Sequence, residues 1–479
     1  MPHILIYLKM TSSPINNDEI LFNHIFSVES LLGEYLTKFK NTTSKGVDRI
    51  NGFQFESIAH SSLATASKKC IDGTYKFTPY LELLKLKGRS KAPRIVGIPS
   101  IRDRIILSKI NQYLASIFPE RVPKKIASAY VRELSEDLKK IHLKDIWICS
   151  TDIKTFYDDI SREILINVIS ERITHPPAIS LIKRALSTPI VPKNTNRSNR
   201  NNYKTHAGVP QGLAISNILA SIYMKDIDEE IPKLGVKYYR YVDDILMYGA
   251  QKEIESSFDI LEEKLRAKEL HVHPKGSEKT KIHELSQEFG YLGYIFNGDE
   301  ISVRESSREK FLQTIASRFS DFSHNSNKRL GKFKYLNDQK IKDIFLEELN
   351  DRITGAFNKG KRYGWIGYYN LITDQSLLYR MDKSIEAMFT RLSAFNNKPP
   401  SELKKLSRSH WEIKFNPQGG YIRDYDAITT LLQKHNFLIS RGRADPDEAL
   451  SDEQIDDRYS KYVQKTLSSM HADEGSGYH

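Results

Sequence analysis

Tyr241-Val242-Asp243-Asp244 is the stretch that decides the fold of this 479-residue chain. It lies between two runs rich in aromatic and apolar residues, Lys237–Arg240 and Ile245–Tyr248, which predict two strands joined by a tight turn. Two adjacent carboxylates at such a turn repel one another, so the arrangement is tolerable only where solvent or divalent cations screen the charges. The tetrapeptide therefore predicts a metal-holding β-hairpin, with an ordinary acidic surface turn as the alternative.

A second acidic site lies upstream, where the strand-like run Asp145–Asp152 ends on a carboxylate. In two-metal phosphoryl transfer, cations about 4 Å apart are bridged by carboxylates from separate strands. Asp152 and Asp243 are predicted to supply those bridges. Tyr157 follows five residues after Asp152, and its ring is expected beneath the incoming sugar, where it would exclude a 2′-hydroxyl.

Between these acidic sites, Ala207–Ala220 contains a Gly-Val-Pro-Gln-Gly turn that opens an apolar helix. Glycines let the backbone approach a ligand closely, and the N–H groups at a helix N-terminus can orient a phosphate or a base pair. Gln211 adds a planar amide to this turn. A purely structural strand-to-helix turn is the alternative for this motif alone.

With these three motifs in order, the chain resembles the reverse transcriptases, and most closely the bacterial ones related to group II intron proteins. Four further blocks carry the resemblance and bring the total to seven between residues 44 and 296. They are Ser44–Ile50, similar to the N-terminal Gly-x-Asp block; Arg94–Ile106, similar to the fingers block; Ser277–Ile282, similar to the Lys-Thr motif; and Phe289–Phe296, similar to the primer-grip hairpin.

The resemblance implies an α+β, right-hand polymerase fold of fingers, palm and thumb, with a ferredoxin-like palm sheet, a helical thumb and a small C-terminal appendage. The implied boundaries are N-terminal helices and fingers over 1–145, a palm over 146–298 with a fingers insertion at about 162–206, a thumb over 299–396, and a C-terminal extension and tail over 397–479.

The resemblance also implies RNA-directed DNA synthesis by two-metal nucleotidyl transfer. Two Mg²⁺ ions, with Mn²⁺ as a possible substitute, would be held by Asp152, Asp243, Asp244 and the backbone carbonyl of Ile153. The implied nucleotide contacts are Lys91 and Arg94 on the triphosphate, Tyr157 as selector of deoxynucleotides, Gln211 near the templating pair and Lys279 near the leaving pyrophosphate. The implied primer-grip residues are Phe289, Gly290, Tyr291, Leu292 and Gly293.

Departures from the family pattern indicate a subfamily. The usual Ser-Pro-Ile-Ser-Pro after Pro-Gln-Gly is Leu213-Ala214-Ile215-Ser216-Asn217 here, and the later Asn is Ser221. These changes favour the intron-free reverse transcriptases of anti-phage defence systems over intron-encoded maturases. Retron enzymes fit less well, because their Asn-Ala-x-x-His and Val-Thr-Gly signatures are missing.

Three alternatives stay open. An RNA-dependent RNA polymerase shares the palm carboxylates, but Tyr157 argues against it. An RNA-binding maturase would need a maturase-type domain after the thumb, which the short C-terminal segment disfavours. Untemplated or protein-primed DNA synthesis is the third, and the 25 tyrosines do not nominate a priming hydroxyl.

Composition agrees with a polyanionic partner, because 72 Lys and Arg against 60 Asp and Glu give a net charge of +12. The resemblance implies a non-coding RNA template, a DNA product and dNTPs as partners, with a homo-oligomer or a partner protein as further possibilities. Two cysteines are too few for a disulfide framework. The run Ile4–Leu8 is too short for a signal segment or a membrane span, so a cytoplasmic protein that does not enter a membrane is expected.

Local patterns give four smaller expectations. Apolar spacing over residues 17–40 predicts one helix that backs the fingers. Residues 300–396 are expected to be mainly helical, and Asn396–Pro400 to interrupt that region before the appendage. His271 and His273 alternate, but without a third metal ligand in view they are interpreted as structural.

Overall fold

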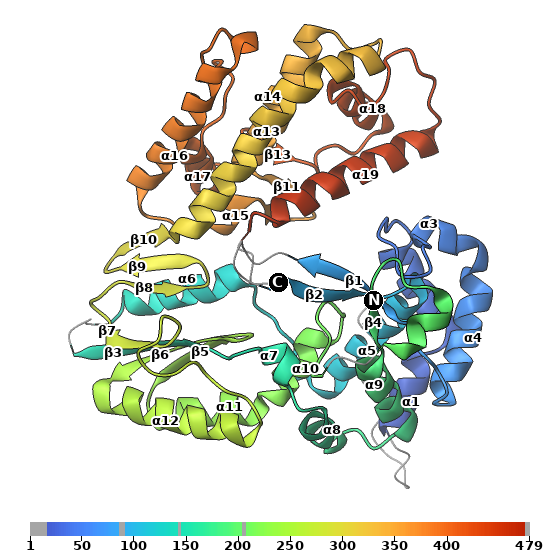
Figure 1. Cartoon of the computed structure of the whole chain (residues 1–479), viewed down its shortest axis with the longest axis vertical. Helices are drawn as coiled ribbons and strands as arrows, with labels where there is room; N and C mark the ends of the chain where they lie inside the picture. Colours follow the sequence, from blue (N-terminus) through green and yellow to red (C-terminus); the bar gives the residue numbers. More distant parts are fainter. Residues whose placement is uncertain (1–16, 86–91, 142–144, 204–206, 475–479) are drawn as a thin grey trace. The chain divides into compact units, whose positions relative to one another are not determined.

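The computed structural model describes residues 17–85, 92–141, 145–203 and 207–474 (Figure 1). Lys91 and the run Ile4–Leu8 lie outside these residues. The described residues form helices and four small sheets, which confirms the predicted α+β class. No helix among them is both long and apolar enough to cross a membrane. Cys70 and Cys149 are buried.

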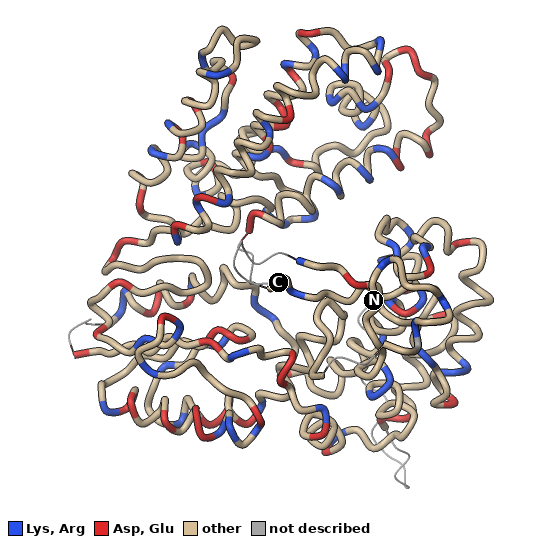
Figure 2. The backbone as a smooth tube through the Cα atoms, in the orientation of Figure 1, with Lys and Arg blue, Asp and Glu red and all other residues tan. Residues whose placement is uncertain are grey.

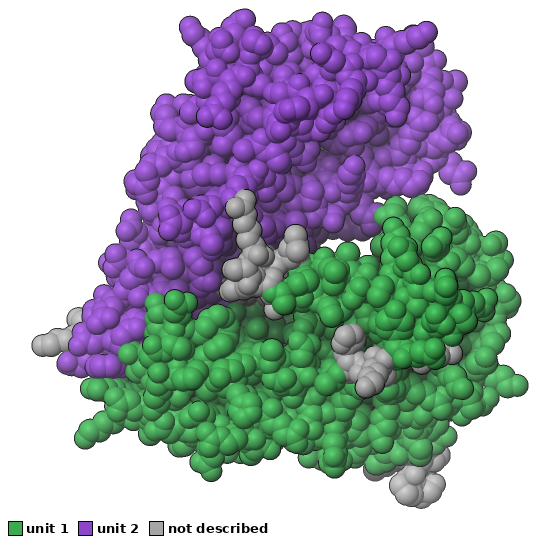
Figure 3. Space-filling view, in the orientation of Figure 1, with its two compact units in different colours: residues 1–124, 151–282 green, residues 125–150, 283–479 purple. Residues whose placement is uncertain are grey.

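Two compact units divide the chain, and each is built from two separate stretches (Figure 3). Unit 1 comprises residues 1–124 and 151–282, and unit 2 comprises residues 125–150 and 283–479. The fingers, palm and thumb boundaries remain predictions.

The helices of unit 1 are α1 (Asn17–Ile25), α2 (Val28–Glu34), α3 (Gly52–Phe55), α4 (Ala59–Ile71), α5 (Ile101–Ile117), α7 (Phe156–Asp159), α8 (Arg162–Ser170), α9 (Pro176–Ser187), α10 (Ser216–Tyr223), α11 (Lys225–Glu230) and α12 (Gln251–Ala267). The single helix predicted over residues 17–40 is wrong. The chain leaves the helix after Ile25 and re-enters it at Val28, because Ser27 is extended and its hydroxyl accepts a hydrogen bond from Ser30 N at 3.2 Å. This is an N-cap, which begins a new helix.

The sheet that carries the acidic motifs has the strand order β5-β6-β3-β7. Its strands are β5 (Lys237–Tyr241), β6 (Asp244–Ala250), β3 (Ile146–Asp152) and β7 (Lys281–Glu284). Strands β5 and β6 pair antiparallel with Tyr241 opposite Asp244, so the hairpin predicted from the sequence is confirmed. The strand predicted to end at Asp152 is confirmed as β3.

Helix α12 packs beside the hairpin in unit 1 and shows why these strands are buried. Its inward residues Ile254, Phe258, Leu261 and Leu265 are at most 1% exposed, and they recur at helical spacing. Acidic and basic residues occupy much of the rest of the helix (Figure 2). A second sheet of unit 1 has the order β2-β1-β4, from β2 (Arg94–Ile98), β1 (Tyr80–Lys85) and β4 (Ile190–Val191).

Unit 2 contains α6 (Ala127–Leu138), α13 (Glu305–Lys332), α14 (Asp338–Thr354), α15 (Trp365–Tyr368), α16 (Gln375–Met388), α17 (Leu406–Phe415), α18 (Leu431–Ser440) and α19 (Asp452–His471). Its two sheets are β10-β9-β8, from β8 (Phe289–Tyr291), β9 (Tyr294–Asn297) and β10 (Glu300–Val303), and β12-β11-β13, from β11 (Ala356–Asn358), β12 (Lys361–Tyr363) and β13 (Arg423–Asp424). The helical character expected for residues 300–396 is confirmed.

Residues after Pro400 contribute to the core of unit 2. Strand β13 pairs parallel with β11, and Ala356 lies in one apolar cluster with Phe437 and Tyr459. The fully buried guanidinium of Arg441 donates to Asp351 Oδ2 at 2.6 Å. The segment after the predicted thumb therefore shares its hydrophobic core and its buried charges with the helices that precede it.

Candidate active site

The tip of the β5–β6 hairpin is a strained turn that presents Asp243. Val242 has a φ of 59°, which is unfavourable for a β-branched residue and costs of order 1–3 kcal/mol. Arg240 Nη1 donates to Val242 O at 2.9 Å, and Arg240 Nε donates to Asp228 Oδ1 at 2.6 Å. These contacts hold the backbone of the turn, and the side chain of Asp243 remains half-buried.

Backbone contacts bring Asp152 beside this tip. Ile153 N donates to Asp243 O at 3.0 Å, and Lys154 N donates to His271 O at 2.8 Å. Burial raises the pKa of Asp243, and the negative charge of Asp152 raises it further. The structure thus unites Asp152, Ile153 and Asp243, and it places Asp244 at the start of β6, opposite Tyr241.

Two cationic or potentially cationic groups lie on Asp152. The ammonium of Lys279 forms an ion pair with Asp152 Oδ2, and His273 Nε2 lies 3.3 Å from Asp152 Oδ1. From the sequence alone, His273 is interpreted as structural and not as part of the site. Its alternation with His271 was the available signal, but the contact with Asp152 depends on the bridge between Ile153 and Val272, which sequence spacing does not show.

A buried hydroxyl pair fixes the backbone next to these side chains. Thr151 Oγ1 and Thr280 Oγ1 lie 2.7 Å apart, and the Thr280 hydroxyl lies 2.6 Å from the carbonyl of His273. Thr151 is 4% exposed and Thr280 is fully buried. Because Thr151 precedes Asp152 and Thr280 follows Lys279, the pair holds both members of the ion pair in register.

The carboxylate site fits a hard divalent cation. Asp152 Oδ1 is buried and, although His273 Nε2 lies 3.3 Å away, it accepts no well-aligned hydrogen bond from the described residues, so it retains lone pairs for a ligand. The mutual repulsion of Asp152 and Asp243 is the kind that a cation relieves, and oxygen donors are the ligands that Mg²⁺ prefers. Among the described residues, no three His, Cys, Asp or Glu side chains gather as a metal cluster. The available donors are therefore this carboxylate pair with its neighbouring backbone oxygens.

Tyr157 is held beside the hairpin. Its hydroxyl donates to Asn217 Oδ1 at 2.6 Å. Burial raises the pKa of the Tyr157 hydroxyl, and the charge of Asp243 acts in the same direction. Asn217 is a second residue that the sequence analysis did not assign to the site. It stood out only as a departure from the family pattern.

The glycine turn approaches the chain itself. Gly208 has a φ of 68°, and a Cβ there would lie 2.1 Å from Tyr157 O. Val209 N donates to that same carbonyl at 2.7 Å. The backbone of the turn therefore supports Tyr157.

Gln211 is also held in place by hydrogen bonds. Its backbone carbonyl accepts from Gly97 N at 2.9 Å, and its side-chain amide nitrogen lies 3.3 Å from Asp158 Oδ1. The apolar helix expected after this turn is confirmed as α10.

Arg94 lies within electrostatic reach of the carboxylates. It starts β2 opposite Lys85. Its positive charge partly opposes the rise in the pKa of Asp243 that burial causes. Arg94 Nε is buried and makes no hydrogen bond to the described residues, so a donor remains for an anionic ligand.

The predicted primer grip lies in unit 2 and buries most of its side chains. Phe289, Tyr291 and Leu292 are at most 4% exposed. Phe289 stacks on Phe296 with ring centroids 4.9 Å apart, and Leu292 O accepts a hydrogen bond from the Tyr368 hydroxyl at 3.1 Å. These side chains serve the core of unit 2, so they are not available to contact nucleic acid.

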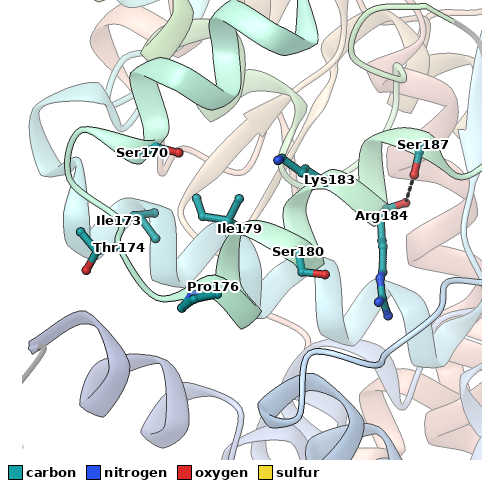
Figure 4. A pocket seen from close by; sticks show the side chains of 9 residues that line it. All are labelled: Ser170, Ile173, Thr174, Pro176, Ile179, Ser180, Lys183, Arg184 and Ser187. Atoms are coloured by element: carbon teal, nitrogen blue, oxygen red, sulfur yellow. Dashed lines mark hydrogen bonds between the residues drawn. The ribbon is translucent and has the colours of Figure 1, made fainter.

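A separate open cavity of about 670 Å³ lies between α8 and α9 (Figure 4). Its lining includes Lys183, Arg184 and four hydroxyl side chains but no carboxylate. Arg184 Nη1 donates to Tyr75 O at 2.8 Å. None of the predicted site residues that the structure describes line this cavity.

The class of protein follows from comparison with known families. Residues 85–296 match the family described as reverse transcriptase (RNA-dependent DNA polymerase). This stretch is a reverse transcriptase domain, and it includes β3, the glycine turn and the β5–β6 hairpin.

The curated relatives agree with the expected resemblance to reverse transcriptases related to group II intron proteins. Group II intron-encoded protein LtrA of Lactococcus lactis subsp. cremoris is 25% identical over 340 residues, which cover 66% of this chain and 54% of that protein. The Putative COX1/OXI3 intron 2 protein of Saccharomyces cerevisiae is 28% identical over 197 residues, covering 40% of this chain and 22% of that protein. The chain thus spans about half the length of the first of these relatives.

Solved structures also match at low similarity. A structure of telomerase from Candida albicans with a fragment of telomeric RNA matches with 12% identity and a TM-score of 0.39, over 88% of this chain and 68% of that chain. A structure of apo telomerase from Candida tropicalis matches with 16% identity and a TM-score of 0.38, over 51% and 60% of the respective chains.

Proposed function

We propose that this protein is an RNA-directed DNA polymerase that makes cDNA on an RNA template by nucleotidyl transfer. The observation that carries the proposal is the hydrogen bond from Ile153 N to Asp243 O at 3.0 Å. It brings the carboxylates of two strands together within the stretch that matches the reverse transcriptase family. Two carboxylates so placed are what two-metal phosphoryl transfer requires.

Asp152, Asp243, Asp244 and the carbonyl of Ile153 would hold two Mg²⁺ ions, or Mn²⁺ in their place. When bound, such ions lower the pKa of an attacking 3′-hydroxyl and neutralise charge on a leaving pyrophosphate. The buried, unbonded Oδ1 of Asp152 and the raised pKa of Asp243 support this assignment.

The remaining residues act through position and charge. Arg94, with its buried unbonded Nε, would bind the triphosphate. Lys279 would exchange its ion pair with Asp152 for the departing pyrophosphate. Tyr157 would exclude a 2′-hydroxyl, and Gln211 would lie near the templating pair. The backbone of the β8–β9 hairpin would position the primer terminus.

The finer function is DNA synthesis on a non-coding RNA in anti-phage defence. It is supported by the departures at Leu213–Asn217 and Ser221 from the pattern of intron-encoded proteins. The competing function is that of a maturase that mainly binds RNA. The similarity to intron-encoded relatives favours this competing function. Untemplated or protein-primed DNA synthesis differs from both of these functions in the DNA product that it would make.

The test is primer extension on a defined RNA template with dNTPs or NTPs, using wild type and Asp243→Asn. We expect template-complementary DNA from the wild type with dNTPs and none from the variant. Sequencing of the nucleic acid that copurifies from the native host would then identify the template. RNA bound equally by both proteins, with DNA from neither under resting or phage-challenged conditions, would instead establish the RNA-binding function. DNA unrelated to the template would establish untemplated synthesis.

A further inference from the structure

An exposed aromatic row runs along α17 in unit 2. The helix lies beside α16 (Figure 1), where His410 Nδ1 is 3.3 Å from Gln375 Nε2. Its core-facing residues include Leu406, His410 and Ile413. On the solvent side, where a helix of this kind ordinarily carries polar residues, Trp411 is 43% exposed and Phe415 is 69% exposed. Their ring centroids are 5.6 Å apart, so the rings form one continuous patch.

Arg408 extends this row by one turn. Its guanidinium lies 4.4 Å from the centroid of the Trp411 ring, which is within cation–π range. The same guanidinium is held by Glu412, whose Oε1 accepts from Nε at 2.8 Å and pairs with Nη2 at 2.7 Å. Because Glu412 is only 3% exposed, a buried carboxylate fixes the arginine on the indole. The α17 row, defined as Arg408, Trp411 and Phe415, is therefore ordered in advance of any partner.

The charge around the α17 row selects the kind of partner. Glu412 is the one carboxylate of α17, and it lies beneath Arg408. Lys414 is exposed and lies between the two aromatic residues in sequence, and its ammonium donates to Ile372 O at 3.3 Å. Lys405 is exposed at the N-cap and pairs with Glu386 at 3.3 Å. Exposed rings with neighbouring cations suit a polyanion that offers planar bases for stacking. An apolar protein surface would gain less from the positive charges.

We propose that the α17 row binds a single-stranded segment of nucleic acid, with bases stacked on Trp411 and Phe415 and phosphates beside Arg408 and Lys414. The row uses none of the residues of the carboxylate site. It requires binding alone, so it holds whether or not the chain synthesises DNA.

The test measures affinity for a fluorescein-labelled oligouridylate of about 20 nucleotides, which is long enough for one stacking groove. Fluorescence anisotropy is recorded with the full chain carrying Asp243→Asn, so that synthesis cannot alter the probe. Trp411→Ala and Phe415→Ala are each expected to weaken binding roughly ten-fold. Trp411→Phe should retain most of the affinity because it keeps a ring. Leu432→Ala is the matched control, since Leu432 is exposed to the same 69% as Phe415, and it should change nothing.

Salt dependence separates phosphate contact from packing. Arg408→Gln is expected to reduce the slope of log affinity against log salt by about one, whereas Leu432→Ala should leave the slope unchanged. The proposal is overturned if Trp411→Ala and Phe415→Ala, shown by circular dichroism to be folded, bind the probe as the parent does. A change in self-association by sedimentation with unchanged probe affinity also overturns it and identifies the row as a protein interface. If Trp411→Ala does not fold, Phe415→Ala at the last residue of α17 decides alone.

Discussion

Two β-hairpins of this chain turn through left-handed backbone, yet they expose opposite kinds of surface. In β5–β6, Val242 has a φ of 59° and the tip Tyr241–Asp244 is half-buried and acidic. In β8–β9, Leu292 and Gly293 have φ values of 48° and 86°, and the apolar side chains of Phe289–Leu292 are at most 4% exposed. A similar turn thus presents carboxylates in unit 1 and closes a core in unit 2. Side-chain chemistry, more than turn geometry, separates a reactive tip from a structural one.

The largest expected difference between the hairpins is in catalysis. Asp243→Asn should reduce primer extension by on the order of 10³-fold, because the loss of a metal ligand removes several kcal/mol of transition-state stabilisation. Asp259→Asn is the control, since Asp259 is an exposed carboxylate of the same unit that pairs with Lys275 at 2.5 Å. Steady-state extension rates at saturating dNTP measure both. If Asp243→Asn extended primers at the wild-type rate, the acidic tip would have no role in the reaction.

Substitutions in the β8–β9 hairpin should instead change the stability of the protein. A Cβ on Gly293 would lie 2.7 Å from the hydroxyl of Tyr369, at a φ of 86°. Gly298 also has a positive φ, 57°, but has no atom within 4 Å of that position. Gly293→Ala should therefore lower the free energy of unfolding by roughly 2–4 kcal/mol, and Gly298→Ala by about 1 kcal/mol. Urea unfolding followed by tryptophan fluorescence measures the two, and equal losses would show that backbone conformation alone matters.

The acidic hairpin is expected to carry a stability cost that the packed hairpin lacks. The pKa of Asp243 is raised above its ordinary value of 3.8 by burial and by Asp152, so the folded state binds the proton more tightly than the unfolded state does. Its favourable contribution is complete below the ordinary pKa and is lost as the pH rises through the raised value. At pH 7.5 without divalent ions, Asp243→Asn should therefore unfold at a higher temperature than the wild type.

Two further measurements make this stability prediction specific. The difference in melting temperature should shrink as the pH falls, because the carboxylate of Asp243 is progressively protonated as the pH falls through its raised pKa. Millimolar Mg²⁺ should raise the melting temperature of the wild type more than that of Asp243→Asn, since binding to the folded state stabilises it. Equal responses of the two proteins to Mg²⁺ would contradict metal binding at this tip.

The sequence predicted the acidic hairpin well because its determinants are local. Strand-forming residues flank Tyr241–Asp244, and the paired register follows from the tight turn. The strand ending at Asp152 and the start of α10 were equally local. The break at Ser27 is also local, because the Ser27 hydroxyl caps a new helix. The apolar repeat continues across Ser27, so the repeat alone predicts one uninterrupted helix.

Long-range packing accounts for what the sequence did not reveal. His273 reaches Asp152 through the pairing of Ile153 with Val272, and nothing in the spacing of the histidines encodes that contact. The burial of the β8–β9 side chains depends on Tyr368, which bonds to Leu292 O from 76 residues away. A motif match can place a hairpin, but only the surrounding core shows which of its side chains remain available.

The smallest expected effect concerns the ring of Tyr157, which lies beside the acidic hairpin. The Tyr157 hydroxyl donates to Asn217 Oδ1 at 2.6 Å, so Tyr157→Phe and Asn217→Ala each remove one hydrogen bond while keeping the ring. Each should relax the preference for dNTPs over NTPs by roughly 2–10-fold, the worth of one hydrogen bond, with dNTP rates nearly unchanged. Tyr157→Ala removes the ring and should relax the preference much further. If Asn217→Ala left the preference intact while Tyr157→Ala abolished it, the ring would select the sugar without help from its anchor. An equal loss of dNTP preference in Tyr157→Phe and Asn217→Ala would instead show that Asn217 helps Tyr157 to select the sugar.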